Sequence, residues 1–354
     1  MQELECATVL FNSISNLATK IIEDRRLGSY IEQSSRYVVY TEKDRATGKW
    51  LYLREETIMA SPLARRYEEN MDRCFEVYAD FVEKLTVHYK EIKPMEETEY
   101  AVKPHDDKKY RYADLDDDKQ RKGFERAYGF DIRTKACDTA RIVLPAATLT
   151  NMAMVANGRT FEHLLKRLYS SDVAEFHDIA KRLHATLNRV IPKYVKRADP
   201  AGVPIWKEID AALVRQIRER MPVLWEPEVP EEEVSWISVP SLVQDGVEPK
   251  WHLCAAALFP FARCSYKKII EALKGKNNAE LIELIKLAVG GRQNRRDRSP
   301  RTFEHGYDVT VEAVGNFGIF RDLHRHRMMT LERQALNPHL GFTVPDDIVA
   351  IGGK

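Results

Sequence analysis

Ala140-Arg141-Ile142-Val143-Leu144-Pro145 is the stretch from which the organisation of this chain can be worked out. A helical pattern starts at about Thr134 and pauses at this apolar run, because proline cannot continue a helix. Two further helical patterns follow, at Thr160–Leu168 and Ser171–Ile191. Arg141 is therefore expected at a junction of helices, where it makes either a structural ion pair or a contact with a ligand.

Upstream, a long half-buried helix is predicted between Ser61-Pro62 and Pro94. Serine followed by proline is typical of a helix start, and a later proline marks its end. Apolar residues recur at helical spacing between these two points: Leu63, Tyr67, Met71, Phe75, Tyr78, Val82, Leu85, Tyr89 and Ile92. Residues 96–126 are crowded with Asp, Lys and Tyr, so an exposed connection without chemistry is expected there.

Downstream, residues 199–235 carry five prolines and an acidic tract at residues 231–233, a composition typical of a connection between domains. A short helix at Trp206–Met221 is expected to interrupt it. We place a domain boundary near residue 235. Beyond it we expect a strand at Val239–Val243, a strand or helix at Trp251–Phe259, helices at Tyr266–Leu273 and Ala279–Val289, and a strand at Tyr307–Val314.

Composition limits the possible functions. The chain has 354 residues, of which 44% are hydrophobic and 31% are charged, as in ordinary globular proteins. Its 55 Lys and Arg nearly cancel its 54 Asp and Glu, so basic recognition has to be local. The five cysteines form no C-x-x-C pair, which indicates reduced thiols and a cytoplasmic protein. The longest apolar run, Cys254 to Ala262, is too short to span a membrane.

Two segments far apart in the sequence combine residues that can bind an anion. Glu32-Gln33-Ser34-Ser35-Arg36-Tyr37 lies near the start, and His324-Arg325-His326-Arg327 lies near the end. Guanidinium groups can hold a phosphate through two hydrogen bonds, and serine hydroxyls can supply further donors. Together the two segments predict a site for a nucleotide and for a second aromatic anion.

A weak internal repeat links the two ends of the chain. An apolar stretch runs from Leu4-Glu5-Cys6-Ala7 to Arg25-Arg26, and a similar one runs from Phe303-Glu304-His305-Gly306 to residues 325–327. The spacing is nearly equal, which favours two imperfect copies of one unit. Glu5 and Glu304 are either ligand contacts or acids at the edge of the core.

These residues resemble the flavin-dependent thymidylate synthase family, whose signature is Arg-His-Arg, seven residues, then Ser, usually within Glu-x-Ser-x-Arg-Tyr. Residues 32–37 match the tail of that signature. The stretch at residues 140–145, then Asn157-Gly158-Arg159, His163, Arg167 and Ala174-Glu175, resembles the C-terminal half of the family.

The chain departs from the family pattern at two points. Asp24-Arg25-Arg26 stands where the first Arg-His-Arg is expected, and Arg325-His326-Arg327 is followed by no matching serine or Arg-Tyr pair. The resemblance therefore implies a divergent, tandem or truncated member. We expect a first copy at residues 1–198 that lacks its N-terminal elements, a connection at 199–235, and the N-terminal half of a second copy at 236–354.

The resemblance implies an α/β (α+β) fold with a mixed sheet flanked by helices and long helical segments, and a homo-oligomer with shared active sites. It implies an FAD enzyme that methylates dUMP, or a related pyrimidine nucleotide, at C5. NADPH reduces the flavin and methylenetetrahydrofolate supplies the carbon, so no enzyme nucleophile is needed.

By the same resemblance, substrate binding is assigned to Glu32, Gln33, Ser34, Ser35, Arg36, Tyr37, Arg141 and Arg167, with Arg167 also catalytic through polarisation of the pyrimidine. Cofactor binding is assigned to Arg25, Arg26, Asn157, Arg159, His163, Arg325, His326 and Arg327. No metal site is expected, because His324 and His326 lack the spacing and neighbours of a zinc site.

Two other readings stay open. A catalytically silent homologue could bind nucleotide or flavin within an assembly, since the first Arg-His-Arg is incomplete. A nucleic-acid-binding module could use the arginine-rich stretch at residues 292–301, although the near-zero net charge argues against it. Neither the G-x-G-x-x-G nor the G-x-x-x-x-G-K-[ST] pattern occurs, so a Rossmann fingerprint and a P-loop lack sequence support.

Overall fold

The computed structural model describes residues 4–103, 108–198, 200–202, 215–216, 219, 234–238, 249–259, 264–289, 310–327, 329–331, 336 and 338–352. The chain divides into two compact units, Met1–Glu228 with Asn316–Lys354, and Val229–Gly315. Each unit has a hydrophobic core of its own.

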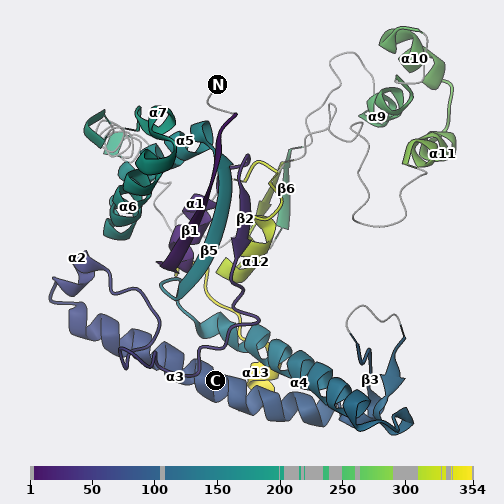
Figure 1. The fold of residues 1–354 in the computed structure, drawn as a ribbon. Coiled ribbons are helices and arrows are strands. Elements are labelled where there is room, and N and C mark those ends of the chain that lie inside the picture. Colours follow the sequence, from purple (N-terminus) through teal and green to yellow (C-terminus); the bar gives the residue numbers. More distant parts are fainter. Residues whose placement is uncertain are drawn as a thin grey trace. The chain divides into compact units, whose positions relative to one another are not determined.

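The first unit is built on a three-stranded sheet (Figure 1), in which β5 (Leu149–Asn157) lies between β1 (Cys6–Ser15) and β2 (Ser29–Glu32). β5 is antiparallel to both of its neighbours. Every strand pairing of the described residues is antiparallel, so the expected mixed sheet is wrong. Side chains alternate along β1 and β5, with one face buried and the other exposed.

A bulge near the end of β1 directs the chain into the first helix. Ser13 has a positive φ of 55° there, and its N–H donates to Asn151 Oδ1 at 2.9 Å. Ser15 then caps α1 (Asn16–Ile22) by accepting the N–H of Ala18 at 3.0 Å. Glu175 in turn accepts from the Ser15 N–H and hydroxyl, so the start of α1 is fixed.

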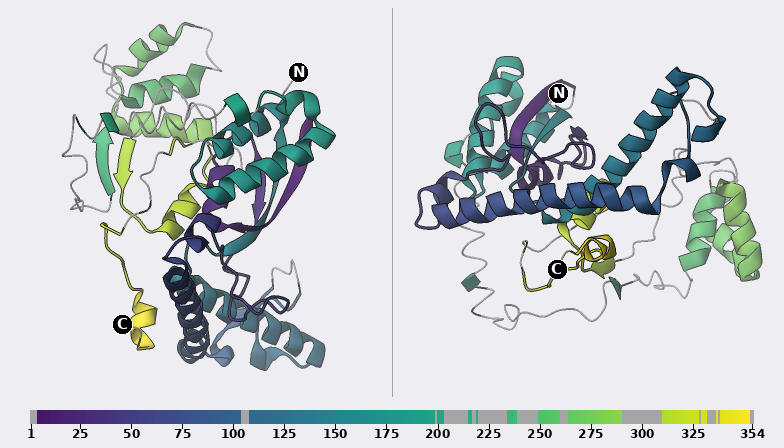
Figure 2. Two further views of the ribbon diagram at one scale, coloured as in Figure 1. Left: turned by 90° about the vertical axis from the view of Figure 1, so that its left-hand side faces the viewer. Right: turned by 90° about the horizontal axis from the view of Figure 1, so that it is seen from below.

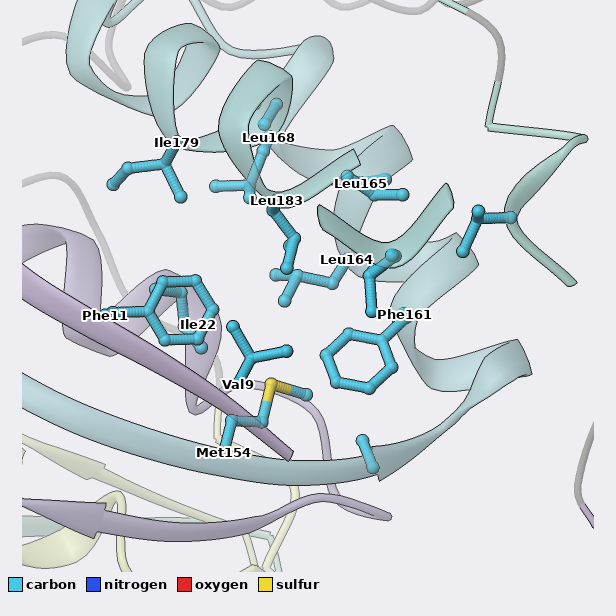
Figure 3. Close-up of a cluster of buried hydrophobic side chains, with 14 of the residues drawn as sticks. Val9, Phe11, Ile22, Met154, Phe161, Leu164, Leu165, Leu168, Ile179 and Leu183 are labelled. Atoms are coloured by element: carbon cyan, nitrogen blue, oxygen red, sulfur yellow. The ribbon is translucent and has the colours of Figure 1, made fainter. Parts of the chain in front are cut away.

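Helices α5 (Gly158–Tyr169), α6 (Ala174–Val190) and α7 (Pro192–Val195) cover the buried face of this sheet. Figure 3 shows Phe161, Leu164 and Leu168 of α5 pointing toward Val9, Phe11 and Met154 of the strands. The spacing of these leucines places them on one side of α5, and burial of each such side chain contributes roughly 1.5–3 kcal/mol. The helices predicted at Thr160–Leu168 and Ser171–Ile191 are confirmed.

A long helical hairpin extends from the foot of the sheet. It follows the short α2 (Glu56–Met59) and consists of α3 (Ala64–Ile92) and α4 (Asp118–Ala140), which lie side by side (Figures 1 and 2). The core that they share is rich in aromatic rings, with Phe75, Tyr78 and Tyr89 from α3 and Phe124 and Tyr128 from α4. The helix predicted between Ser61 and Pro94 is confirmed.

The expectation that residues 96–126 form only an exposed connection is wrong. This stretch holds β3 (Glu99–Tyr100) paired with β4 (Tyr110–Arg111), and α4 already begins at Asp118. Asp117 caps α4 by accepting the N–H of Lys119 at 3.2 Å. The aspartates that suggested a loop therefore mark a helix start.

Two late helices belong to the first unit, α12 (Phe317–Leu323) and α13 (Asp346–Ala350). Asp347 accepts a 2.6 Å hydrogen bond from the hydroxyl of Tyr89 on α3. The chain therefore returns to its early elements after the second unit.

The second unit contains an antiparallel pair, β6 (Val234–Ser238) with β7 (Thr310–Ala313), and the helices α9 (Pro249–Leu258), α10 (Tyr266–Leu273) and α11 (Asn278–Val289). The predicted helices at 266–273 and 279–289 and the strand within 307–314 are confirmed, and 251–259 is mostly helical. The strand predicted at 239–243 lies outside the described residues, as does most of the helix predicted at 206–221.

Two further sequence expectations concern membrane-spanning helices and the state of the cysteines. None of the described helices is both long and apolar enough to cross a membrane. All five cysteines are free.

Candidate functional site

The turn after β2 presents the first predicted binding residues. The N–H groups of Tyr37 and Val38 both donate to the carbonyl of Ser34 at 3.1 Å, which closes the turn. Gln33 anchors its start, because its side-chain oxygen accepts from Asn151 Nδ2 at 2.8 Å. Arg36 is thereby placed on the outside of a tight, fixed loop.

One carboxylate joins the two predicted substrate-binding arginines. Arg36 Nε donates to Asp138 Oδ1 at 2.8 Å, and Arg141 Nη2 lies 2.8 Å from the same oxygen. Arg141 begins a short 3-10 turn directly after α4, and its Nη1 also donates to the hydroxyl of the buried Ser35 at 3.4 Å. We call Arg36, Arg141, Asp138 and Ser35 the arginine cluster.

The two guanidinium groups differ in their electrostatics. The hydrogen bond to Asp138 raises the pKa of Arg36. Burial lowers the pKa of Arg141, against the opposing effect of Asp138. Both remain cations at neutral pH. Asp138 is shared by the two guanidinium groups, and Asp322 lies 3.5 Å from Arg36 as a second acid, so N–H groups of both arginines stay available to an anion.

Helix α12 adds charged residues from the late part of the chain. Asp322 Oδ2 lies 3.5 Å from Arg36 Nη2, and Arg321 Nη2 lies 3.6 Å from Glu32 Oε1. The Arg321 side chain is only 10% exposed, and its buried Nε has no hydrogen-bond partner among the described residues. Residues almost 300 positions apart therefore share one polar region.

A buried ionic network lies under this region. Lys20 is 1% exposed, its Nζ lies 3.1 Å from Glu32 Oε2, and it also pairs with Glu23. The hydroxyl of Thr19 donates to Glu32 Oε1 at 2.9 Å. Glu32 is thus held by Thr19, Lys20 and Arg321, because a buried carboxylate is stable only with such partners.

His324 joins the end of α12 to the residues after α1. Its Nε2 lies 2.9 Å from Asp24 Oδ1, and its Nδ1 lies 3.8 Å from Glu23. The hydrogen bond to Asp24 and the nearby Glu23 carboxylate raise the pKa of His324. Burial alone would raise the pKa of Glu23, but the contacts with His324 and Lys20 outweigh it and lower that pKa. The pair therefore favours charged His324.

Two further arginines link residues 26–28 to residues 327–330 by hydrogen bonds. Arg327 donates to the carbonyl of Gly28, and Arg26 Nη2 donates to the hydroxyl of Thr330 at 2.8 Å. Both arginines are exposed and both acceptors are uncharged oxygens, so these bonds do not neutralise either guanidinium. A Cβ on Gly28 would lie 2.2 Å from the Tyr30 hydroxyl, so a larger residue there requires the Tyr30 ring to move.

The remaining predicted cofactor residues of the first unit lie elsewhere. Asn157 caps α5 by accepting the N–H of Thr160 at 2.9 Å. Arg159, His163 and Arg167 follow at four-residue intervals on the exposed face of α5. Within the described part, neither His163 nor Arg167 has a side-chain contact with the arginine cluster.

The other predicted residues have the following positions. Tyr37 stacks on Phe130 of α4 with ring centroids 5.8 Å apart, and both rings are largely exposed. Arg325 Nη1 lies 3.1 Å from Asp322 Oδ1, and His326 is exposed. Arg25 pairs with Asp24 at 3.7 Å. Glu304 and the stretch at 292–301 lie outside the described residues.

Sequence reasoning missed four residues of this region: Lys20, Asp138, Arg321 and Asp322. Asp138 had a signal, because an acid three residues before Arg141 on a helix faces it. Lys20 lies five residues before Arg25, and Arg321 lies four residues before Arg325. Their burial depends on contacts between distant segments, which local patterns do not report.

Two open cavities of the described residues are formed elsewhere, one beside Lys93 and Asp131 and one beside Arg54 and Glu68. The described residues contain no group of three or more His, Cys, Asp or Glu arranged to hold a metal ion.

Comparison with known proteins gives a consistent pattern. A family model described as thymidylate synthase complementing protein matches residues 2–193. A UPF0159 protein of Chlamydia muridarum is 29% identical over 351 residues, which cover 98% of this chain and 60% of the relative. A UPF0159 protein of Chlamydia pneumoniae is 30% identical with the same coverage, and one of Thermoplasma acidophilum is 30% identical over 97% of this chain and 66% of the relative. The chain thus spans about 60% of the length of the two chlamydial relatives.

Proposed function

Since the chain belongs to the thymidylate synthase complementing protein family, we propose that it is a flavin-dependent thymidylate synthase-like enzyme that methylates dUMP or a related pyrimidine nucleotide at C5. The observation that carries the proposal is the arginine cluster. Arg36 and Arg141 come from distant parts of the sequence, yet Asp138 orients both toward one region. Two oriented guanidinium groups beside serine hydroxyls are suited to a nucleotide phosphate.

Within this proposal the chain's own residues bind and orient the nucleotide. Arg36 and Arg141 hold the phosphate, with Ser34 and Ser35 as further donors, while Asp138 fixes the arginines. Glu32, held by Lys20 and Arg321, accepts hydrogen bonds from the nucleotide. Such preorganisation lowers the cost of bringing the uracil ring into its reactive position.

The arginines at residues 25–26 and 325–327 are suited to bind a flavin cofactor. Arg26 and Arg327 carry positive charge that their uncharged hydrogen-bond acceptors do not neutralise. With Arg25, Arg325 and His326 they fit the pyrophosphate of FAD. The flavin, when bound, supplies the electron pair that reduces the transferred carbon to a methyl group. NADPH and methylenetetrahydrofolate are the proposed co-substrates.

We further propose that active sites are shared between copies of the chain in a homo-oligomer. Arg159, His163 and Arg167 line an exposed face of α5, where another copy can take them up. Arg167 of one copy would then polarise the pyrimidine held by the arginine cluster of another. A strand and a helix precede both arginine segments, as β1–α1 and β7–α12, which supports an internal duplication.

The alternative is a silent homologue that binds a nucleotide without turnover. It is favoured by the Asp24–His324 pair, because Asp24 stands where the resemblance expects the first arginine of Arg-His-Arg. In this reading the acid serves to attach the late segment.

Release of tritium from [5-³H]dUMP, with FAD, NADPH and methylenetetrahydrofolate present, tests the proposal. We expect release by the full chain and its loss in Arg36→Ala, with nucleotide affinity reduced at least about tenfold because a charged hydrogen bond is removed. Arg45→Ala is the matched control, since Arg45 is an exposed arginine whose ion pair among the described residues is with Glu42. Nucleotide and FAD binding without release would support the silent homologue, and failure to bind either would contradict both readings.

A further inference from the structure

One face of α4 carries four exposed cations, Lys119, Lys122, Arg126 and Arg133, with Phe130 between the last two. At 3.6 residues per turn these five side chains fall within roughly 80° of arc. We call the four cations the basic strip. It is about 21 Å long at a rise of 1.5 Å per residue.

None of the four cations of the strip forms an ion pair within the described residues. Asp118 lies one helical turn before Lys122 and offsets part of its charge, whereas two other acids of α4 have partners of their own. Glu125 accepts from the Tyr112 hydroxyl at 2.8 Å, and Asp131 pairs with Lys93. Lys122 and Arg126 are one helical turn apart and repel each other, which destabilises the helix unless an anion lies between them.

The strip has two distinct ends. Its inner end lies beside the turn that carries Arg36, because Phe130 stacks on Tyr37, the next residue along the chain. Its outer end is closed by four exposed acids, Asp114, Asp116, Asp117 and Asp118. A polyanion that extends outward from the cluster is therefore attracted over a limited length and then repelled.

We propose that the basic strip binds the oligocarboxylate tail of the carbon-donating cosubstrate, a chain of γ-linked glutamates attached to an aromatic head that lies next to the nucleotide, between the arginine cluster and the inner end of the strip. This inference rests on the proposed function. A γ-linked glutamate has two more chain bonds than an α-linked residue and spans roughly 6 Å. The turn between Lys122 and Arg126 rises about 6 Å as well. One carboxylate per unit therefore meets about one cation of the strip.

The observations favour a short tail over nucleic acid. Single-stranded nucleic acids need a positive groove that follows the backbone over several nucleotides, with aromatic platforms along it. Here the strip ends in acids, and the exposed ring stack lies at its inner end alone. A ligand with a handful of negative charges matches this length.

The test compares two stable folates, 5-formyltetrahydrofolate with one or with five glutamyl units, by titration calorimetry on the full chain loaded with FAD and dUMP. We expect the five-unit form to bind about tenfold more tightly, as expected from a few exposed ionic contacts. The double variant Lys122→Glu/Arg126→Glu should bring the two affinities together while leaving the one-unit affinity within about twofold. Lys181→Glu/Arg189→Glu, which makes the same charge change on α6, should keep the tenfold preference.

Each other outcome overturns the inference. Equal affinity of both folates in the unmodified chain, or a preference that survives Lys122→Glu/Arg126→Glu, removes the tail from the strip but leaves the proposed function intact. Absence of binding by either folate removes the proposed carbon donor as well. A ten-nucleotide oligothymidylate that binds through Lys122 and Arg126 more tightly than the five-unit folate assigns the strip to nucleic acid.

Discussion

At the scale of single residues, Asp24 and His324 explain how this chain tolerates a departure from the family pattern. Asp24 replaces an expected arginine, and it accepts a hydrogen bond from a histidine 300 positions away. The His324 side chain is 7% exposed and also faces Glu23, Lys20 and the ring of Phe320. Asp24 therefore does not contact a ligand at this position but attaches the segment around His324 to the residues after α1.

This pairing predicts a pH dependence of stability. The pKa of His324 is raised above its ordinary value of 6.5, so its contribution is complete below that pH and is lost as pH rises through the higher folded pKa. We expect His324→Gln to lower the free energy of unfolding by about 1.5–3 kcal/mol at pH 6, the range for a hydrogen bond to a charged group. The difference from the unmodified chain should shrink toward alkaline pH, as urea unfolding at pH 6 to 9 can measure.

A control distinguishes the titration of His324 from that of the neighbouring carboxylate of Glu23. The pKa of Glu23 is lowered, so its contribution is present above its ordinary value of 4.5 and disappears only as pH falls below that value. Glu23 therefore does not titrate in the window of His324. A constant difference between variant and unmodified chain from pH 6 to 9 would contradict the histidine assignment.

At the scale of elements, the sequence predicted the long amphipathic helices and missed the strands of the main sheet. The apolar spacing of α3 is regular over many turns, so it is readable locally. β5 was missed, because Leu149–Asn157 has few polar residues on its exposed face and lies between helical patterns. Aspartates before α4 were interpreted as loop residues, although Asp117 is an N-cap.

The same limit applies to the candidate site. Residues 32–37 and Arg141 were found because their pattern is local and resembles a known signature. Lys20 and Arg321 were not, because a lone cation in an amphipathic helix is ordinarily exposed. Only the folded chain brings Glu32 between them.

Asn157 gives a prediction at the element scale, since it was assigned to the cofactor and also caps α5. Asn157→Ala should destabilise the protein by about 1 kcal/mol, because the N–H of Thr160 loses its acceptor. Asn157→Asp should leave the free energy of unfolding within a few tenths of a kcal/mol of the unmodified protein, since aspartate caps a helix equally well. Urea unfolding of both variants measures this.

The two variants also separate the roles of Asn157. If the amide contacts the flavin, FAD affinity should fall in Asn157→Asp although the fold is retained. Equal instability of both variants would contradict the capping role, and unchanged FAD affinity in Asn157→Asp would remove the residue from the cofactor site.

At the scale of the whole molecule, shared sites predict complementation between inactive variants. Arg36→Ala and Arg167→Ala should each lose activity alone. Mixed under conditions that exchange subunits, they should regain up to about a quarter of the unmodified activity for a dimeric exchange, since some sites then contain both arginines. The tritium-release assay measures the recovery.

The control for complementation is a mixture of Arg36→Ala with Arg141→Ala. These residues lie in one cluster of the same chain, so mixing them should restore nothing. Absence of recovery in the Arg36 and Arg167 mixture, with subunit exchange verified by labelled chains, would place both arginines in a single protomer.

The contacts between residues 20–36 and 321–330 have a consequence for biosynthesis. A ribosome releases the first sheet and its covering helices long before it reaches Arg321, and domains fold as they emerge. During that interval Glu32 has Lys20 as its sole buried cation, and the surface that later receives α12 faces water. The entropic penalty of closing a loop grows only slowly with its length, so a separation of some 300 residues does not prevent these contacts from forming late. Until they form, the surface that α12 later covers is open to association with other chains.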